Sequence, residues 1–185
     1  SEIIKYRQVS ENSQVAMRLM GGIGYAYGNS RVMPYSEQFY IGGANSIRAF
    51  QIRSIGPGSY HPEKRSVTAY LDQTGDIKLE GNIGYRFKIA GRLNGAVFVD
   101  AGNVWLLRKE KERPGGEFRL KDLWREIALG TGFGLRYDIT YIVIRADLGV
   151  ALHAPYNTGK PGYFNIRNYD FRDGLVLNLA IGYPF

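Results

Sequence analysis

The chain contains no cysteine, which excludes a disulfide framework, a thiolate nucleophile and a thiolate metal site. No apolar run approaches the roughly 18 residues that a membrane-spanning helix needs. The two histidines, His61 and His153, fall in expected loops, and no H-E-x-x-H or G-x-S-x-G motif occurs. We therefore expect a protein that is not an enzyme and that uses no metal and no cofactor.

Basic charge is present but not concentrated. The net charge of +7 suggests an anionic partner, yet no continuous Lys/Arg run exists, so a charge spread over faces and loops is the simpler interpretation. The segment KEKERPGG at 109–116 could bind lipopolysaccharide or a partner, or be a solvated external loop. The glycines of GTGFG at 130–134 alternate along a strand instead of opening a helix, so they predict no phosphate site. We expect no nucleic-acid partner.

Period-two alternation dominates the sequence and predicts long β-strands. One side of each segment is large and apolar, as at Ile77 and Ile83, and the other mixes Gly and Ala with charged residues, as at Glu80. The predicted strands are 14–28, 76–89, 93–105, 127–138, 141–152 and 175–185, with 1–10 as a weaker candidate.

The length and chemistry of these strands favour an all-β, antiparallel transmembrane β-barrel over a soluble sandwich. Globular strands usually span about five or six residues, whereas membrane strands need about 9–11. A sandwich would give its second face to solvent and prefer Thr, Ser and Lys there, while glycines suit a crowded or water-filled interior. We expect Ile83, Leu135 and Ile144 to face lipid.

The connections alternate between short and long, as in outer-membrane barrels with tight periplasmic turns and long external loops. The long ones are 29–75, 106–126 and 153–174. Aromatic residues then gather at two expected rims, as amphipathic rings do at head groups. The periplasmic rim would hold Phe87, Tyr137, Tyr141, Tyr183 and Phe185, and the outer rim Tyr25, Tyr27 and Trp105.

Seven strands do not make an even-numbered closed barrel, and an open edge in lipid would leave unpaired backbone groups. The missing part could be preceding strands of the same protein, a partner copy or an eighth strand. The start SEIIKYRQ reads as mid-protein sequence without a signal-peptide pattern, so we expect missing N-terminal strands.

Four motifs, in order along the chain, carry a resemblance to a known family. They are PYSEQFYIGGANSIRAF at 34–50, AVFVDAGNVW at 96–105, GTGFGLRYD at 130–138 and NLAIGYPF at 178–185. Together they resemble the BamA/TamA-like family of outer-membrane protein assembly factors, also known as the bacterial surface antigen family. The resemblance implies the C-terminal part, about seven strands, of a sixteen-stranded barrel behind periplasmic POTRA domains.

The resemblance also implies a loop that folds back into the barrel lumen, here residues 29–75. Its motif residues would be Gly42, Gly43, Ile47 and Phe50, and Arg48 would pair with acids of the inner wall, Glu80 and Asp100. Both acids lie on the lumen side by alternation alone. Read without the family, Arg48 could equally be a solvated loop arginine. The family has glycine where this chain has Ala49, and a positive φ there would cost about 1 kcal/mol.

The last strand is the expected seam of the barrel, and its edge could template a client strand by β-augmentation. A plain closing strand is the alternative interpretation. Gly182 and Pro184 should weaken pairing near its end. The named seam residues are Leu175, Leu177, Leu179, Ile181, Gly182, Tyr183 and Phe185.

The expected function is insertion or translocation of outer-membrane proteins, in the bacterial outer membrane. The expected partners are outer-membrane lipid and lipopolysaccharide, unfolded outer-membrane protein clients, and accessory periplasmic or lipoprotein subunits. A two-partner-type secretion pore and the barrel portion of a patatin-like protein are the alternatives.

Overall fold

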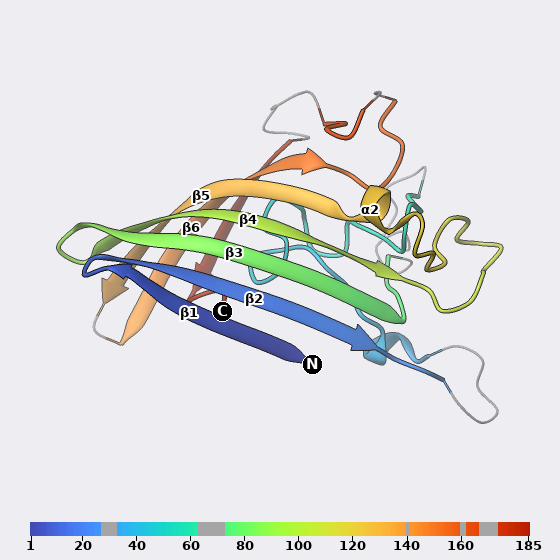
Figure 1. The fold of residues 1–185 in the computed structure, drawn as a ribbon, viewed down its shortest axis with the longest axis horizontal. Helices are drawn as coiled ribbons and strands as arrows, with labels where there is room; N and C mark the ends of the chain where they lie inside the picture. Colours follow the sequence, from blue (N-terminus) through green and yellow to red (C-terminus); the bar gives the residue numbers. More distant parts are fainter. Residues whose placement is uncertain (27–32, 63–72, 140, 160–161, 167–173) are drawn as a thin grey trace.

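Seven antiparallel strands form one curved sheet in chain order (Figure 1), which confirms the all-β antiparallel prediction. The computed structural model describes residues 1–26, 33–62, 73–139, 141–159, 162–166 and 174–185. The strands are β1 (Glu2–Ser10), β2 (Ser13–Ile23), β3 (Ile77–Ala90), β4 (Leu93–Trp105), β5 (Ala128–Ile139), β6 (Ile142–His153) and β7 (Leu175–Ile181). Within these residues the sheet is open, with β1 and β7 at its two edges.

Helical structure in the described residues is limited to η1 (Tyr35–Glu37) and α2 (Leu123–Glu126). No described helix is long and apolar enough to cross a membrane. The weakest predicted strand, 1–10, is a true strand, because β1 pairs with β2 from Glu2 to Ser10 with one register shift near its end.

The two faces of the sheet differ as the alternation predicts. On the convex side, Ile83, Val97, Leu135 and Ile144 are exposed apolar residues. The concave side carries buried charged and amide residues: Arg18, Glu80, Asn82, Arg86, Asp100, Arg136, Arg145 and Asp147. Since this polar side is the buried one, something in the structure must cover it.

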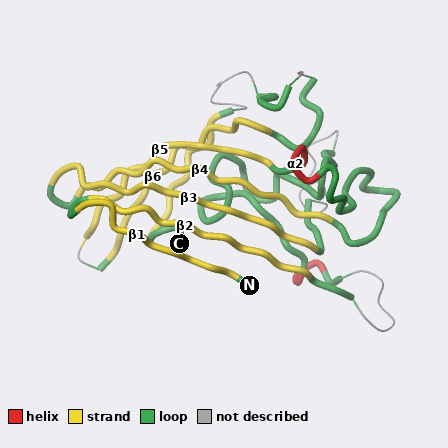
Figure 2. The backbone as a smooth tube through the Cα atoms, in the orientation of Figure 1, coloured by secondary structure: helices red, strands yellow, loops and turns green. Residues whose placement is uncertain are grey.

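The cover is the β2–β3 connection, whose described residues 33–62 fold back along the concave side of the sheet (Figure 2). Ile41, Ile47, Phe50 and Ile55 of this connection form an apolar core. They pack against the wall residues Val104, Ala128 and Ala151, and against Ala154 just after β6. The core of the molecule therefore lies between the sheet and its own loop.

The register aligns the polar wall residues across the sheet. Arg18 of β2 is opposite Asn82 of β3, Asn82 is opposite Asp100 of β4, and Asp100 is opposite Gly130 of β5. Directly opposite residues lie about 4.5–5.5 Å apart, so the four residues form one continuous row. This row is the floor on which the loop tip rests.

Two sequence predictions about aromatic positions are wrong. The last strand stops at Ile181 and not at Phe185, because Gly182 takes φ +88 and ends the extended backbone. Trp105 was expected in the outer aromatic rim, where rings sit at head groups, but its side chain is fully buried. The β4–β5 connection covers it, with the ring of Phe118 packed edge-on at 5.6 Å. Tyr27 lies outside the described residues.

Candidate functional site

The loop tip, residues 42–50, is a closed turn that fixes the position of Arg48. Gly42 and Gly43 have φ values of +97 and +87, which disfavour residues with a Cβ atom. The Gly43 amide donates to the carbonyl of Phe50 (2.8 Å), and the Phe50 amide donates to the carbonyl of Ile47 (3.1 Å). The buried side chains of Ile47 and Phe50 anchor the turn in the apolar core.

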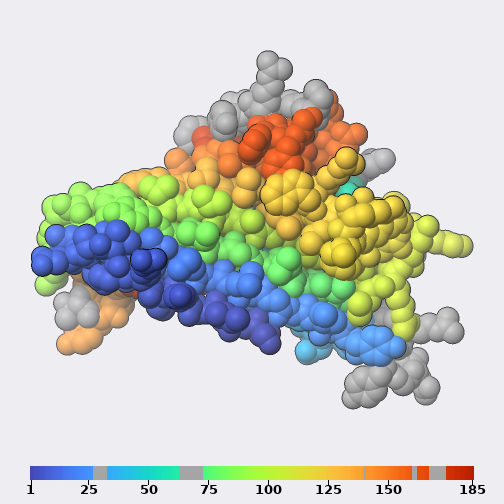
Figure 3. Space-filling view, in the orientation of Figure 1, coloured from blue at the N-terminus to red at the C-terminus, as the bar shows by residue number. Residues whose placement is uncertain are grey.

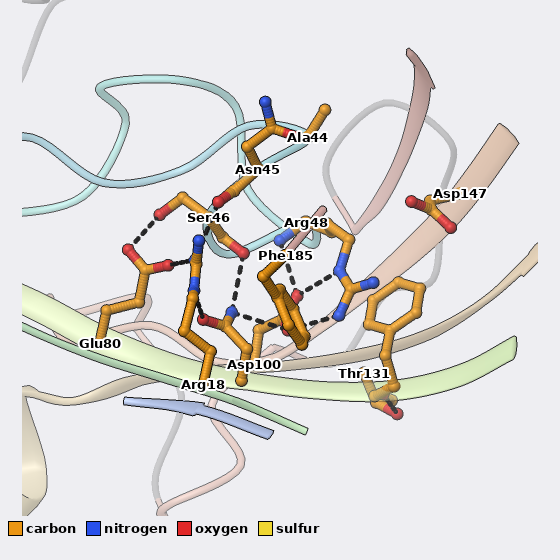
Figure 4. Close-up of polar contacts among 12 residues, drawn as sticks. Arg18, Ala44, Asn45, Ser46, Arg48, Glu80, Asp100, Thr131, Asp147 and Phe185 are labelled. Atoms are coloured by element: carbon orange, nitrogen blue, oxygen red, sulfur yellow. Dashed lines mark hydrogen bonds and ion pairs between the residues drawn. The ribbon is translucent and has the colours of Figure 1, made fainter. Parts of the chain in front are cut away.

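Arg48 makes a forked ion pair with Asp100 of β4 (Figure 4). Its Nε donates to Oδ2 at 2.8 Å and its Nη2 to Oδ1 at 2.7 Å. The backbone N–H of Arg48 also donates to Oδ2, at 3.0 Å. The guanidinium carbon lies 3.5 Å from the ring centre of Phe98. Both charged side chains are almost wholly buried, so each supplies the counter-charge that the other needs.

Glu80, the second acid expected at Arg48, pairs with other cations. Its carboxylate contacts the Arg18 guanidinium and lies 3.0 Å from the Lys78 ammonium. Its remaining contact with the loop is through Ser46, whose hydroxyl donates to Oε2 at 2.6 Å. The predicted three-residue clamp is therefore two adjacent ion pairs, because Glu80 lies one register row from Asp100 and closer to β2.

Backbone carbonyls of the loop tip supply most of the other contacts with the wall. Arg18 donates to Asn45 O (2.8 Å), Asn82 to Ser46 O (3.0 Å), Arg145 to Ala44 O (3.0 Å) and Asn178 to Arg48 O (2.8 Å). These four wall residues come from β2, β3, β6 and β7. Sequence reasoning did not single them out, although all four are polar residues on the predicted lumen side.

Asn82 links the two ion pairs. Its Oδ1 accepts from Arg18 Nε at 2.9 Å, and its Nδ2 donates to Asp100 Oδ1 at 2.9 Å. A third charged group, Arg136, Arg145 and Asp147, lies on β5 and β6, where the Asp147 carboxylate contacts both guanidiniums at 2.8 and 3.0 Å. The loop tip thus rests on two linked ion pairs, with the third charged group beside them.

Ala49 fits because two wall residues are glycines. A Cβ at Gly149 would lie 2.7 Å from the Cα of Ala49, and a Cβ at Gly130 would collide with the Cβ of Ala49. Among the described residues, the one non-glycine position with positive φ is Arg53, so Ala49 carries no such strain. The glycines of the lumen side therefore make room for the loop.

The end of the chain turns toward the same floor, contrary to the outward position expected for Phe185. The Phe185 ring centre lies 5.0 Å from the guanidinium carbon of Arg18 and 5.9 Å from that of Arg48 (Figure 4). Arg86 donates to the Phe185 carbonyl at 2.8 Å, and the Tyr183 hydroxyl lies 3.3 Å from Asp138. Leu177, Leu179 and Ile181 stay exposed on the convex side.

The histidines lie apart from this floor. The His61 ring stacks on Tyr156, and His153 Nε2 lies 2.8 Å from the carbonyl of Arg125. Across the residues that the structure describes, no group of three or more His, Cys, Asp or Glu could hold a metal ion.

Three comparisons relate this chain to known proteins. The family model of the Omp85 superfamily domain matches residues 2–174. The outer membrane protein assembly factor BamA of Neisseria meningitidis serogroup B is 27% identical over 89 residues, or 45% of this chain and 11% of that protein. The crystal structure of BamA from Haemophilus ducreyi lacking POTRA domains 1–3 matches 97% of this chain and 33% of that chain, with a TM-score of 0.60 and 17% identity. The chain therefore spans a minor part of both relatives, and the structural likeness shows the shared fold.

Proposed function

This chain belongs to the Omp85 superfamily, and we propose that it is part of an outer-membrane barrel that inserts or translocates outer-membrane proteins. The observation that carries the proposal is the loop tip held on a buried polar floor, with Arg48 and Asp100 at its centre. A guanidinium this deeply buried needs a charged partner. Because the wall carries a buried acid, it stabilises the loop path that brings Arg48 to that acid.

In this proposal the Arg48–Asp100 pair is the clamp between loop and wall, and the neighbouring Arg18–Glu80 pair supports it. Asn178 of β7 donates to the carbonyl of Arg48, and Phe185 lies beside the same guanidinium. The last strand and the clamp are therefore in direct contact. Movement of the seam strand would change the surroundings of Arg48, which gives the loop a means of responding to the state of the seam.

We propose that clients pair with the free edge of β7. β7 has seven residues, whereas β2 to β6 have 11 to 14, so it offers a short ladder that is weak in hydrogen bonds. Pairing of a client strand with this edge would let the client leave the barrel sideways into lipid. Accessory subunits and lipid are further partners under this proposal.

Cysteine crosslinking tests the edge directly, since this chain has no cysteine of its own. We would place single cysteines at Leu177 and Leu179 on the convex side of β7, and one at Tyr85 on the same side of β3, whose strand is paired on both edges. Stalled clients with a cysteine in their last strand should form disulfides with the β7 positions and not with Tyr85→Cys.

A two-partner-type secretion pore makes the opposite prediction. Its client would crosslink to lumen-side positions such as Gly84 and would not crosslink to β7. That result would overturn templating at the seam, although the family and fold would stand.

A further inference from the structure

The β4–β5 connection carries an exposed surface that the loop clamp does not use. Six of its residues form what we call the aromatic-basic patch: Phe118, Arg119, Leu120, Lys121, Trp124 and Arg125. Leu120 and Trp124 are 77% and 71% exposed, values far above those of apolar residues that serve a protein core. Three cations lie among these apolar side chains.

The segment bearing the patch lies against the convex side of the sheet. Trp105 Nε1 donates to Glu126 Oε2 at 2.7 Å, and Asn103 donates to the Glu126 carbonyl. Phe118 and Leu123 border one apolar cavity together with Ile77, Leu79 and Trp105. Figure 3 shows the yellow β4–β5 connection on the same face as the green and blue strands. The patch therefore continues the exposed apolar wall.

Trp124 is exposed but held in place. Its ring stacks on Tyr163 at 5.5 Å, and Tyr163 stacks on His153 at 4.2 Å. His153 in turn lies 2.8 Å from the carbonyl of Arg125. Phe164, 65% exposed, extends the apolar surface next to Tyr163. An exposed aromatic surface whose rings are held by stacking is pre-organised for contact with a partner.

The exposed charge of the segment is positive, although its formal charges balance. The Glu126 side chain is buried and accepts a hydrogen bond from the indole of Trp105, Glu117 pairs with Arg119, and Asp122 is half-buried. All three cations of the patch remain exposed. Aromatic side chains mixed with Lys and Arg suit the head-group layer of a membrane, where rings sit at the boundary and cations meet phosphate.

We propose that the aromatic-basic patch binds the surface of the membrane leaflet at this end of the barrel. Leu120 and Trp124 enter the head-group layer, and Arg119, Lys121 and Arg125 bind lipid phosphate groups. This inference rests on the proposed position of the barrel in an outer membrane. Binding on one flank of the barrel fixes the depth of the barrel in the membrane.

Fluorescence quenching by brominated lipids tests the proposal in the reconstituted protein. The measurement uses phosphatidylcholine vesicles with and without phosphatidylglycerol. The quenching of Trp124 is the difference between the quenching of the unsubstituted protein and that of the Trp124→Phe variant. Lipids brominated near the head group should quench Trp124 more than lipids brominated near the bilayer centre. Phosphatidylglycerol should increase that quenching.

Charge replacement identifies the lipid-binding cations. Arg119, Lys121 and Arg125 are changed together to Gln. In anionic vesicles this should lower the ratio of molecules with Trp124 in the head-group layer to molecules with Trp124 in water by about fivefold per cation removed. The matched control changes Arg108, Lys109 and Lys111 to Gln, which removes the same charge from the exposed start of the connection. Equal effects of the two triple variants would overturn the proposal, since charge alone would then explain the result.

A probe on the barrel wall separates the two proposals. In the Trp124→Phe background, Ile83→Trp places an indole on the convex face of β3, where lipids brominated near the bilayer centre should quench it. Quenching at position 83 without quenching of Trp124 overturns the patch proposal and leaves the proposed function standing. Absence of quenching at both positions overturns both, and protection of Trp124 only by a second protein assigns the patch to a protein partner.

Discussion

Release of the loop tip from the wall should be governed by the Arg48–Asp100 pair. Arg48→Ala removes two charged hydrogen bonds, at 2.7 and 2.8 Å, and the contact with Phe98. Loss of one partner of a buried ion pair costs about 3–5 kcal/mol. Asp100 keeps two other donors, the Arg48 backbone N–H and the amide of Asn82, so we expect the lower limit.

A buried reporter on the loop makes this free energy measurable. Ile47 is fully buried in the loop tip, and Ile47→Cys would react with a thiol reagent only when the loop opens. A loss of about 3 kcal/mol corresponds to roughly 150-fold faster labelling of this introduced thiol in the Arg48→Ala background. Arg92→Ala, in the exposed β3–β4 turn, serves as the control and should change the labelling rate less than about threefold.

A double-mutant cycle isolates the pair from its neighbours. Asp100→Asn leaves the guanidinium without a counter-charge, and the Arg48→Ala/Asp100→Asn double variant has no buried charge at either position. We expect a coupling of about 2 kcal/mol or more, because each single change leaves one charge buried and unpaired. Coupling below about 0.5 kcal/mol would refute the reasoning that this ion pair holds the loop.

Two further predictions concern the surroundings of the loop. Gly149→Ala should destabilise the docked loop by about 1–3 kcal/mol, since the new methyl group meets Ala49, whereas Gly84→Ala should be nearly neutral because no atom lies within 4 Å of its added Cβ. The rate of thiol labelling in the Ile47→Cys background compares the two variants, and equal rates would contradict the packing argument. Burial raises the pKa of Glu126 above its ordinary 4.5, so the folded state binds the proton of this carboxyl more tightly than the unfolded state does. The stability that this proton binding contributes is present below pH 4.5 and is lost as the pH rises through the raised pKa. Glu126→Gln keeps an acceptor for the Trp105 indole and should abolish that decrease, measured as the denaturant midpoint of Trp105 fluorescence against pH; an unchanged pH profile would refute the assignment.

The alternation of side chains predicted the sheet and its two faces because it is a local property with a period of two residues. Ile83 falls on the exposed side and Glu80 on the buried side without knowledge of any other strand. Gly42 and Gly43 were singled out by the family resemblance alone, and the structure gives both glycines positive φ.

Strand ends were less predictable, since they depend on single backbone angles and on coverage by distant segments. The pattern of alternation continues through Gly182 to Phe185, but the left-handed conformation of Gly182 ends β7 and turns Phe185 toward the arginines. Trp105 fits the outward side by alternation, yet residues more than ten positions later bury it.

The sequence by itself determined that this chain forms long antiparallel strands with one apolar side and one charged, glycine-rich side, but it left Arg48 open as either a buried or a solvated loop arginine. Only the tertiary structure decided which acid Arg48 takes, because Asp100 and Glu80 are both buried acids of the concave side and differ only in register row. In the fold, Arg48 pairs with Asp100, 52 residues away in the chain, and Arg18 pairs with Glu80, 62 residues away. Such a choice depends on the path of the loop across the wall, and no local pattern encodes that path.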